Sequence, residues 1–366
     1  MVKNKVFFLT GATGLIGSYL LKTLLANGCI VHVVARSGKG RKAEERVLDA
    51  LHFWGDDSHV ELNKNLFVWE GDITSAECGL SSSALEALIP AVDEIVHCAA
   101  AIEFHLSWEQ IYQINVFGTQ QVLDIALRCQ TQGKSVKCNH LSTAFICGKH
   151  SDTFSENDFD VGQEFNTNYE KSKFQAEKIV REYREQGLWV DIFRPAFVVG
   201  ESATGKTFRF QHLYQILQLW NREVFDIFPI TGDRPVNMVT VDAVAGSLYA
   251  ILDSTTVLNG TYHLFPQTPV FLKKFLEIAS QLIGFKKPRL CTWPEFDASP
   301  LTPVQKAIIN MNSLYFISDP QLSSDYTGEA LKKIDYSFPE IDDEMLARLI
   351  QYVITSNFIK PKSPQR

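Results

Sequence analysis

Apolar runs alternate with amphipathic stretches over the first two hundred residues of the chain. The apolar runs are short and rich in Val, Ile, Leu and Phe, which is typical of buried strands. Strands are predicted at Val6–Thr10, Ile30–Ala35, Leu66–Trp69, Glu94–Cys98, Val136–Leu141 and Val190–Phe193.

Helices are predicted between these strands. In the stretch Leu15–Ala26, apolar residues recur every three or four positions, and Asn27-Gly28 provides a C-terminal stop. Longer helices are predicted at Trp108–Cys129 and Tyr169–Glu185. Alternating strands and helices are the pattern of a parallel sheet covered on both faces, so we expect an α/β fold of the Rossmann type, doubly wound.

The pattern becomes less regular after Pro195. Helices are predicted at Arg209–Trp220, Asp242–Leu252 and Leu272–Ile283, a late strand at Tyr262–Phe265, and irregular structure at Phe225–Pro235. The stretch Cys291–Asp325 contains four prolines and resists assignment. We therefore expect a dinucleotide-binding domain over 1–200 that 236–266 rejoins, a smaller substrate-binding lobe formed by 201–235 and 267–358, and a disordered tail at 359–366.

Composition excludes several classes of partner. The net charge is −7 and no long basic run occurs, which argues against nucleic acid. No apolar run reaches membrane-spanning length, and the apolar start of the chain leads directly into a glycine-rich turn, so it reads as a strand. Seven scattered cysteines without a Cys-x-x-Cys pair favour a reduced, cytoplasmic setting. No metal site is expected, because His97 and Cys98 lack further ligand-type neighbours.

The segment Gly11-Ala12-Thr13-Gly14-Leu15-Ile16-Gly17 lies between the first strand and the first helix. Glycines at these positions allow a tight turn, close approach to a pyrophosphate, and packing of the helix on the sheet. The helix N-terminus then presents free N–H groups to phosphate. The segment predicts a dinucleotide site whose binding residues are Gly11, Thr13, Gly14, Leu15, Ile16 and Gly17.

Arg36 follows the second strand, where folds that prefer the unphosphorylated cofactor carry an acid for the ribose hydroxyls. A guanidinium matches the geometry of a phosphate, so we expect NADPH rather than NADH. Asp72 and Ile73 follow the third strand and are expected near the adenine. The small residues Ala99 and Ala100 follow the fourth strand and allow the backbone to approach the cofactor.

Tyr169 and Lys173 lie four residues apart on a predicted helix, so their side chains share one face. The ammonium is expected to favour the phenolate and to lower the pKa of the tyrosine. Thr143 ends the fifth strand, and strand ends converge on one cleft. A hydroxyl and a phenol on either side of one carbonyl oxygen would polarise it for hydride attack.

Taken in order, these motifs resemble the extended short-chain dehydrogenase/reductases over roughly residues 5–265. The match consists of the glycine turn, Asp72, His97-Cys98-Ala99-Ala100, Asn115, Ser142-Thr143, Tyr169-x-x-x-Lys173 and Arg194-Pro195. The resemblance implies that Tyr169 transfers a proton with Thr143, that Lys173 holds the nicotinamide ribose, and that Asn115 supports a proton relay. It also implies that Pro195 and Val198 line the nicotinamide.

Within that superfamily, three segments look most like the thioester reductase branch, which includes the fatty acyl-CoA reductases, or male sterility proteins, and carboxylic acid reductases. The segments are His140–Phe145, Ser172–Glu177 and Arg194–Gly205. The branch passes hydride from NADPH to an acyl thioester, so the expected substrate is a small-molecule or carrier-bound acyl group and an acyl-carrier protein is a candidate partner. By position, Phe104, His105, Glu201, His212 and Tyr214 are candidate substrate residues.

Two other functions fit the same scaffold. The first is a nucleotide-sugar epimerase or dehydratase, against which Arg36 and the aromatic-rich segment Phe208–Phe228 both argue. The second is a non-catalytic dinucleotide sensor, in which loss of the tyrosine or lysine would be expected. The pattern leaves open whether the chain is a monomer or a homodimer and which carbonyl compound it reduces.

Overall fold

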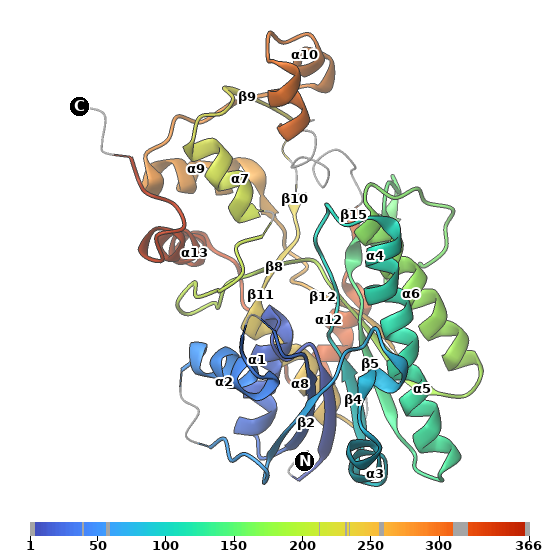
Figure 1. Ribbon diagram of the computed structural model, residues 1–366. Coiled ribbons are helices and arrows are strands. Elements are labelled where there is room, and N and C mark those ends of the chain that lie inside the picture. The colour runs from blue at the N-terminus through green and yellow to red at the C-terminus, as the bar shows by residue number, and fades with distance from the viewer. Residues whose placement is uncertain are drawn as a thin grey trace.

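A seven-stranded, entirely parallel sheet forms the centre of the molecule in the computed structural model (Figure 1). The structure describes residues 4–38, 40–55, 59–211, 213–230, 233, 235–255, 260–309 and 321–362. In sheet order the strands are β12 (Thr261–Leu264), β7 (Trp189–Pro195), β5 (Lys137–Leu141), β4 (Glu94–His97), β1 (Val6–Thr10), β2 (Ile30–Ala35) and β3 (Leu66–Glu70). The chain turns from β1 outward to β2 and β3, then returns to β4 on the other side of β1.

Helices cover both faces of this sheet. One face carries α1 (Leu15–Ala26), α2 (Ala43–Phe53), α8 (Val241–Asp253) and α12 (Asp325–Lys332). The other face carries α3 (Ser82–Ala91), α5 (Gly118–Thr131) and α6 (Asn168–Glu185). This arrangement confirms the predicted doubly wound α/β class.

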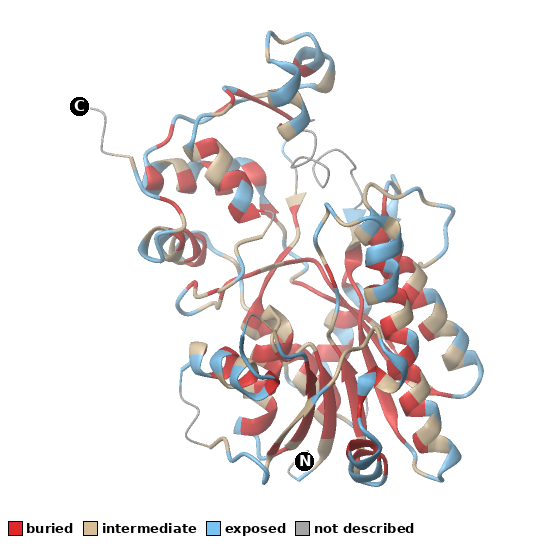
Figure 2. Cartoon of the chain, viewed as in Figure 1, coloured by how far each residue is buried: buried red, intermediate tan, exposed pale blue. Residues whose placement is uncertain are grey.

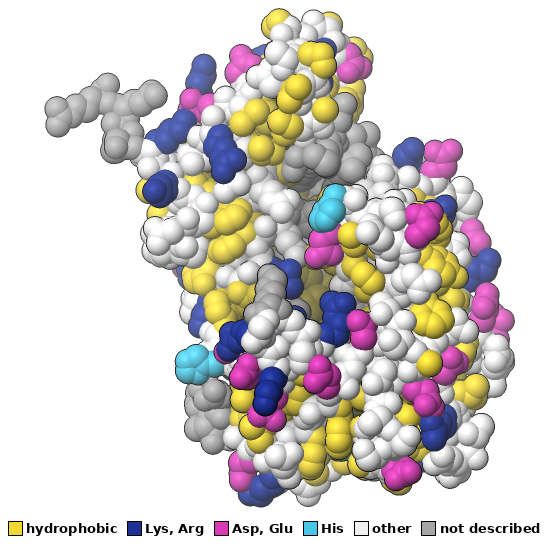
Figure 3. Space-filling model, in the orientation of Figure 1, with side chains coloured by type: hydrophobic (Ala, Val, Ile, Leu, Met, Phe, Trp, Pro, Cys, Tyr) yellow, Lys and Arg dark blue, Asp and Glu magenta, His cyan; other side chains and the backbone are white. Residues whose placement is uncertain are grey.

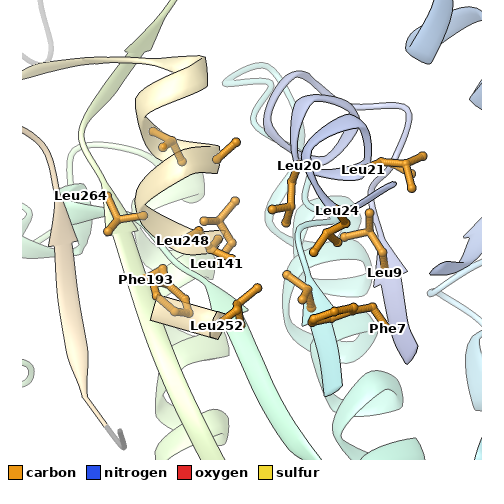
Figure 4. Close-up of a cluster of buried hydrophobic side chains, with 14 of the residues drawn as sticks. Phe7, Leu9, Leu20, Leu21, Leu24, Leu141, Phe193, Leu248, Leu252 and Leu264 are labelled. Atoms are coloured by element: carbon orange, nitrogen blue, oxygen red, sulfur yellow. The ribbon is translucent and has the colours of Figure 1, made fainter. Parts of the chain in front are cut away.

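Alternation along the strands decides which side chain enters which core. In β1, Phe7 and Leu9 pack with α1 and α8, whereas Phe8 between them packs with α3 and α5. Figure 4 shows the first of these cores, where Leu20 and Leu24 of α1 approach the sheet beside α8. Figure 2 shows the buried residues concentrated along the strands and on the helix faces that meet them.

A second lobe lies beyond the C-terminal ends of the strands (Figure 1). Its helices are α7 (Leu213–Asn221), α9 (Leu272–Ile283), α10 (Trp293–Asp297) and α13 (Asp343–Thr355), which enclose a separate apolar core. Its short strand pairs are β8 (Phe197–Val199) with β11 (Met238–Thr240), β9 (Ile227–Pro229) with β14 (Arg289–Cys291), and β10 (Pro235–Val236) with β13 (Val270–Phe271). The remaining pair, β6 (Thr153–Phe154) with β15 (Gln321–Leu322), lies beside the main sheet, and the short turns are η1 (Ala76–Gly79) and η3 (Ala144–Cys147).

Three sequence expectations need correction. The helix predicted at Trp108–Cys129 consists of α4 (Trp108–Tyr112), a π-helical turn η2 (Gln113–Phe117) and α5. The helix predicted from Arg209 begins at Leu213, and the residues before it run as an irregular segment. Within the predicted tail, Ile359 is buried and Lys362 donates its N–H to Ile283, so this part is packed; 363–366 lie outside the described residues.

No helix in the described part of the chain combines the length and apolarity needed to cross a membrane.

Candidate active site

Two adjoining clefts open at the C-terminal edge of the sheet, between the main body and the lobe. They lie where the chain switches direction between β1 and β4, which is the point where open α/β sheets bind ligands. The larger cleft has a volume of about 540 Å³ and runs over the ends of β1, β2 and β4. The smaller, of about 190 Å³, lies over β5 and β7. Figure 3 shows a hollow between lobe and main body with Lys and Arg side chains around it.

The predicted cofactor residues all line these clefts. The larger cleft is lined by Gly11, Thr13, Gly14, Arg36, Asp72, Ile73, Ala99 and Ala100. The smaller is lined by Leu15, Ile16, Gly17, Tyr169, Lys173, Pro195 and Val198.

The glycine turn requires glycine at two positions. Gly11 has φ +78°, and a Cβ there would lie 2.6 Å from the backbone nitrogen of Ala99. A Cβ on Gly17 would lie 2.3 Å from the carbonyl oxygen of Gly11. The first turn of α1 has no side-chain cap, so its N–H groups face the cleft without a partner from the protein. An uncapped helix start behind a glycine cradle fits a pyrophosphate.

Arg36 and Asp72 lie together at the outer end of the larger cleft. Their side chains form a long ion pair of 3.5 Å and are 60% and 34% exposed. Hydrogen bonds from Thr74 and the charge of Arg36 outweigh burial and hold the pKa of Asp72 below its usual range. The Arg36 guanidinium therefore remains accessible to an anion in the cleft.

Arg46 also lines this end of the cleft, and sequence reasoning missed it. It projects from α2, and its Nη1 donates to the backbone carbonyl of Arg36. Ten residues separate the two arginines, so only the packing of α2 beside β2 brings them together. The sequence indicated only that Arg46 is a basic residue in the first turn of the second helix.

His97 has a structural role beneath the loop after β4. Thr119 donates to the Asn115 carbonyl, so the Nε2 of His97 must donate to Thr119, and its Nδ1 accepts from Thr10. Thr10 in turn accepts the N–H of Ala99 (3.2 Å). Burial and the charge of Lys173 lower the pKa of His97 to about 3, so the ring is neutral and this relay holds the loop after β4 in place.

The structure brings together Thr143, Tyr169 and Lys173. Thr143 is 3% exposed at the end of β5 and hydrogen-bonds with the Tyr169 hydroxyl. Lys173 follows one turn after Tyr169 on α6, and all three line the smaller cleft. A hydroxyl and a phenol thus line one cleft beside a buried ammonium.

The expected lowering of the Tyr169 pKa is wrong, because burial outweighs any nearby positive charge. Burial raises the pKa of Tyr169 to about 12, although the hydrogen bond from Thr143 opposes this shift. Burial also lowers the pKa of Lys173 to about 8, against the attraction of Glu177. The Lys173 ammonium donates a hydrogen bond to the carbonyl oxygen of Leu141, the last residue of β5, at 2.8 Å. Tyr169 is therefore protonated at neutral pH.

Asn115 lies within the π-helical turn and is 1% exposed. Its amide accepts from the Ala101 N–H at 2.7 Å and donates to the Ala101 carbonyl (2.8 Å) and to Ser172 (2.9 Å). Asn115 lines neither cleft. These contacts join the loop after β4 to the helix that carries Tyr169 and Lys173, so Asn115 positions both sides of the site.

The candidate substrate residues are more scattered. Tyr214 lines the smaller cleft and His105 the larger. The Phe104 ring lies 6.5 Å from that of Tyr169. Glu201 lines neither cleft, because its carboxylate accepts from Tyr19 (2.7 Å) and Thr204 (2.6 Å) on the α1 side of the loop. His212 lies outside the described residues.

Behind the site, a buried ion cluster joins α6 to the sheet. Glu177 and Arg194 are both fully buried and pair at 2.6 Å, and Ser142 donates to the same carboxylate at 2.7 Å. Burial opposes the ionisation of Glu177, but Arg194 and Arg181 lower its pKa to about 2. Arg194 thus turns away from the cleft and fixes the helix that bears the tyrosine.

Within the described residues, no group of three His, Cys, Asp or Glu side chains is arranged to hold a metal ion.

Comparison with known proteins adds a family to this geometry. A family model described as male sterility protein, an NAD-binding domain, matches residues 9–248. Among curated relatives, a nonribosomal peptide synthetase from Aspergillus flavus is 28% identical over 72% of this chain and 26% of its own length. A carboxylic acid reductase from Segniliparus rugosus is 28% identical over 69% of this chain and 22% of its own. The chain thus spans about a quarter of the length of these relatives.

Among solved structures, the terminal R domain of the myxalamid PKS-NRPS pathway superposes with a TM-score of 0.81 at 22% identity. The superposition covers 99% of this chain and 93% of that domain. At this identity the likeness establishes the fold: the lobe and the sheet are arranged as in that R domain.

Proposed function

Since this chain belongs to the male sterility protein family of NAD-binding domains, we propose that it is an NADPH-dependent reductase of acyl thioesters. Family membership confirms the resemblance carried by the sequence motifs, and it supports a nicotinamide-dependent oxidoreductase. The proposal adds three things to that: the phosphorylated cofactor, the residues Thr143, Tyr169 and Lys173 as the catalytic group, and an acyl thioester as substrate.

One observation carries the proposal. Thr143, Tyr169 and Lys173 come from a strand end and a helix, yet they line the same small cleft as the start of α1. A carbonyl group in that cleft can accept hydrogen bonds from both hydroxyls while it lies next to the nicotinamide position. That is the arrangement required for carbonyl reduction.

The chemistry follows from the protonation states. The reduced nicotinamide, when bound, supplies a hydride to the acyl carbon. Thr143 and Tyr169 donate hydrogen bonds to the carbonyl oxygen and stabilise its developing negative charge. Because the pKa of Tyr169 is raised to about 12, this residue holds a proton at neutral pH and can release it to that oxygen. Lys173 would hold the nicotinamide ribose and supply positive charge nearby. The reduced carbon then carries a hydroxyl and the sulfur; the hydroxyl proton returns to Tyr169 as the C–S bond breaks, the thiolate takes a proton from solvent, and an aldehyde remains.

Arg36 and Arg46 support the preference for NADPH. Two guanidinium groups line the outer end of the larger cleft, and no acid occupies the end of β2. The carboxylate of Asp72, at the same end of the cleft, meets Arg36 only at 3.5 Å. A 2′-phosphate there would meet two planar donors suited to it.

An apolar acyl group fits the smaller cleft. Ile102, Phe145, Phe197 and Leu213 are among the residues that line it. We assign cofactor binding to 1–200 with 236–266, and substrate binding to the lobe formed by 201–235 and 267–358. A narrow apolar cleft that opens to solvent suits an acyl chain presented on a carrier or on coenzyme A.

The direct test is NADPH oxidation against a panel of acyl-CoAs, acyl-pantetheine thioesters, aldehydes and nucleotide sugars. We expect turnover with acyl thioesters and recovery of the aldehyde. Tyr169→Phe removes the proton donor and is expected to lower kcat by about 10²- to 10⁴-fold while leaving the NADPH dissociation constant within about twofold.

The matched control is Tyr112→Phe, which removes a hydroxyl from an exposed tyrosine on α4. It should leave the rate unchanged. Turnover of nucleotide sugars in place of thioesters would replace the reductase assignment with the epimerase one, and unchanged turnover in Tyr169→Phe would remove this residue from the mechanism.

A further inference from the structure

Arg209 is a cation placed where the two clefts meet. It lines both of them, together with Gly14 at the start of α1 and Glu103 in the loop after β4. It belongs to the irregular segment that runs from β8 to α7, where a helix was expected. Its side chain therefore comes from the lobe side of the cleft and faces the glycine turn across it.

Aromatic residues on either side hold Arg209 in this position. Phe208 packs against the main body, with ring centroids 5.1 Å from Phe53 and 5.7 Å from Trp54 of the α2 end. Phe210 packs in the lobe, stacked at 4.2 Å on Phe358. The buried Thr207, next to Phe208 in the chain, donates its hydroxyl to the carbonyl of Arg209 and accepts the Arg209 N–H, each at 3.2 Å. The backbone of Arg209 is thus fixed from both sides.

The guanidinium itself is not used in the fold. It is exposed, and within the described residues its side chain makes no hydrogen bond or ion pair. Glu103 also lines both clefts, but its carboxylate accepts the N–H of Ile102 at 3.0 Å. An anchored, unpaired cation above an uncapped helix start is complementary to an anion placed between them.

We propose that Arg209 binds the pyrophosphate of the nicotinamide cofactor from the lobe side, opposite the N-terminus of α1. The inference rests on the proposed cofactor but not on the proposed substrate. It differs in kind from the role of Arg36, because the pyrophosphate is common to NADPH and NADH and the 2′-phosphate is not. Arg209 thus sets the affinity for both cofactors, and Arg36 sets the choice between them.

The roles of Arg209 and Arg36 can be separated by measuring how tightly variants bind ligands, without any measurement of turnover. Dissociation constants of NADPH, NADH and adenosine 2′-monophosphate are measured by fluorescence and by competition. Arg209→Gln is expected to weaken NADPH and NADH alike by about tenfold and to leave adenosine 2′-monophosphate, which has no pyrophosphate, unchanged. Arg36→Gln is expected to weaken NADPH and adenosine 2′-monophosphate and to spare NADH.

Arg222→Gln is the matched control, since it makes the same change at an exposed position of the lobe that lines neither cleft. Arg209→Lys should fall between wild type and Arg209→Gln, because the charge remains but the planar fork is lost. Cofactor affinities within twofold of wild type in Arg209→Gln would overturn the proposal, and so would a change confined to the KM of the thioester. Failure of the reductase assignment would appear instead as wild-type protein that binds NADPH but reduces no thioester.

Discussion

Lys173 shows how burial sets the chemistry of a single side chain. It is 2% exposed, and desolvation brings its pKa down to about 8. The group is therefore an ammonium at neutral pH but lies close to losing its charge. Tyr169, with a pKa of about 12, keeps its proton throughout this range. We therefore expect Lys173, and not the tyrosine, to set the alkaline limit of activity.

We predict that kcat/KM for thioester reduction falls above about pH 8, as Lys173 loses its proton. The contribution of Lys173 to the free energy of unfolding should instead increase as the pH rises. Its pKa is lower in the folded state than in the unfolded chain, so between about pH 8 and 10.5 the unfolded chain binds more protons and stability rises with pH. The gain is at most about 3 kcal/mol.

To check this prediction, kcat/KM and the free energy of unfolding in urea are measured against pH for the wild type and for Lys173→Met. The variant should be inactive at all pH values and should lack the stability gain, and the difference between the two proteins isolates the lysine. An alkaline loss of activity that coincides with loss of folded wild-type protein would contradict it, since unfolding would then explain the fall in rate.

At the scale of elements, the turn from β1 to α1 combines two different demands on glycine. A methyl on Gly17 would collide with the backbone of Gly11, so α1 would have to move away from the sheet. A methyl on Gly14 would meet only the Gly11 oxygen, at 3.1 Å, and Gly14 lines both clefts. Gly17 therefore allows α1 to pack closely on the turn, whereas the missing side chain of Gly14 leaves space in the clefts.

The substitutions Gly17→Ala and Gly14→Ala should therefore separate stability from binding. We expect Gly17→Ala to lower the free energy of unfolding by about 2 kcal/mol, because backbone atoms cannot yield to the added carbon. Gly14→Ala should keep nearly wild-type stability, since its φ of −89° suits alanine, but weaken NADPH binding about tenfold. Urea unfolding and NADPH titration of both variants test this; equal effects on both quantities would contradict it.

Elements with a strong local pattern could be predicted from the sequence to the residue. β1, β2, α1 and α9 match their predicted bounds because apolar periodicity and terminal glycines define them. The π-helical turn around Asn115 could not be found this way, since one wider turn leaves the apolar spacing of the helix intact. The strand pairs of the lobe are two or three residues long, too short for any period to appear.

The same division holds for the site. Residues attached to a strand end or to a glycine turn could be placed in advance, because parallel strands bring their ends to one edge. Arg46 and Arg209 reach the cleft through the packing of a helix and the path of an irregular segment, and no local pattern encodes either. Glu201 was placed at the substrate by adjacency in sequence, whereas its hydrogen bonds turn it toward Tyr19.

At the scale of the whole molecule, the smaller cleft takes its walls from both the sheet and the lobe. A ligand that fills it must therefore stabilise both parts together. We predict that NADP⁺ with a medium-chain acyl-pantetheine thioester raises the melting temperature by a few degrees more than NADP⁺ alone, the oxidised cofactor preventing turnover.

Thermal unfolding measured with and without each ligand provides the test, with a UDP-sugar as the matched polar ligand. The UDP-sugar should add nothing beyond NADP⁺, because Phe145, Phe197 and Leu213 give this cleft an apolar wall with nothing to recognise a sugar ring. Greater protection by the UDP-sugar than by the thioester would contradict the apolar assignment of this cleft.

The last strand of the sheet has a consequence for how the protein is made. β12 pairs with β7, and α8, which precedes β12, packs against α1, yet the segment that begins the lobe separates them in sequence. A ribosome adding roughly 5 to 20 residues per second needs several seconds to pass from β7 to β12. During that interval the nascent chain presents an unpaired strand edge and the uncovered leucines of α1. We therefore expect two chains growing on one messenger to be able to exchange α8 and β12 during this interval.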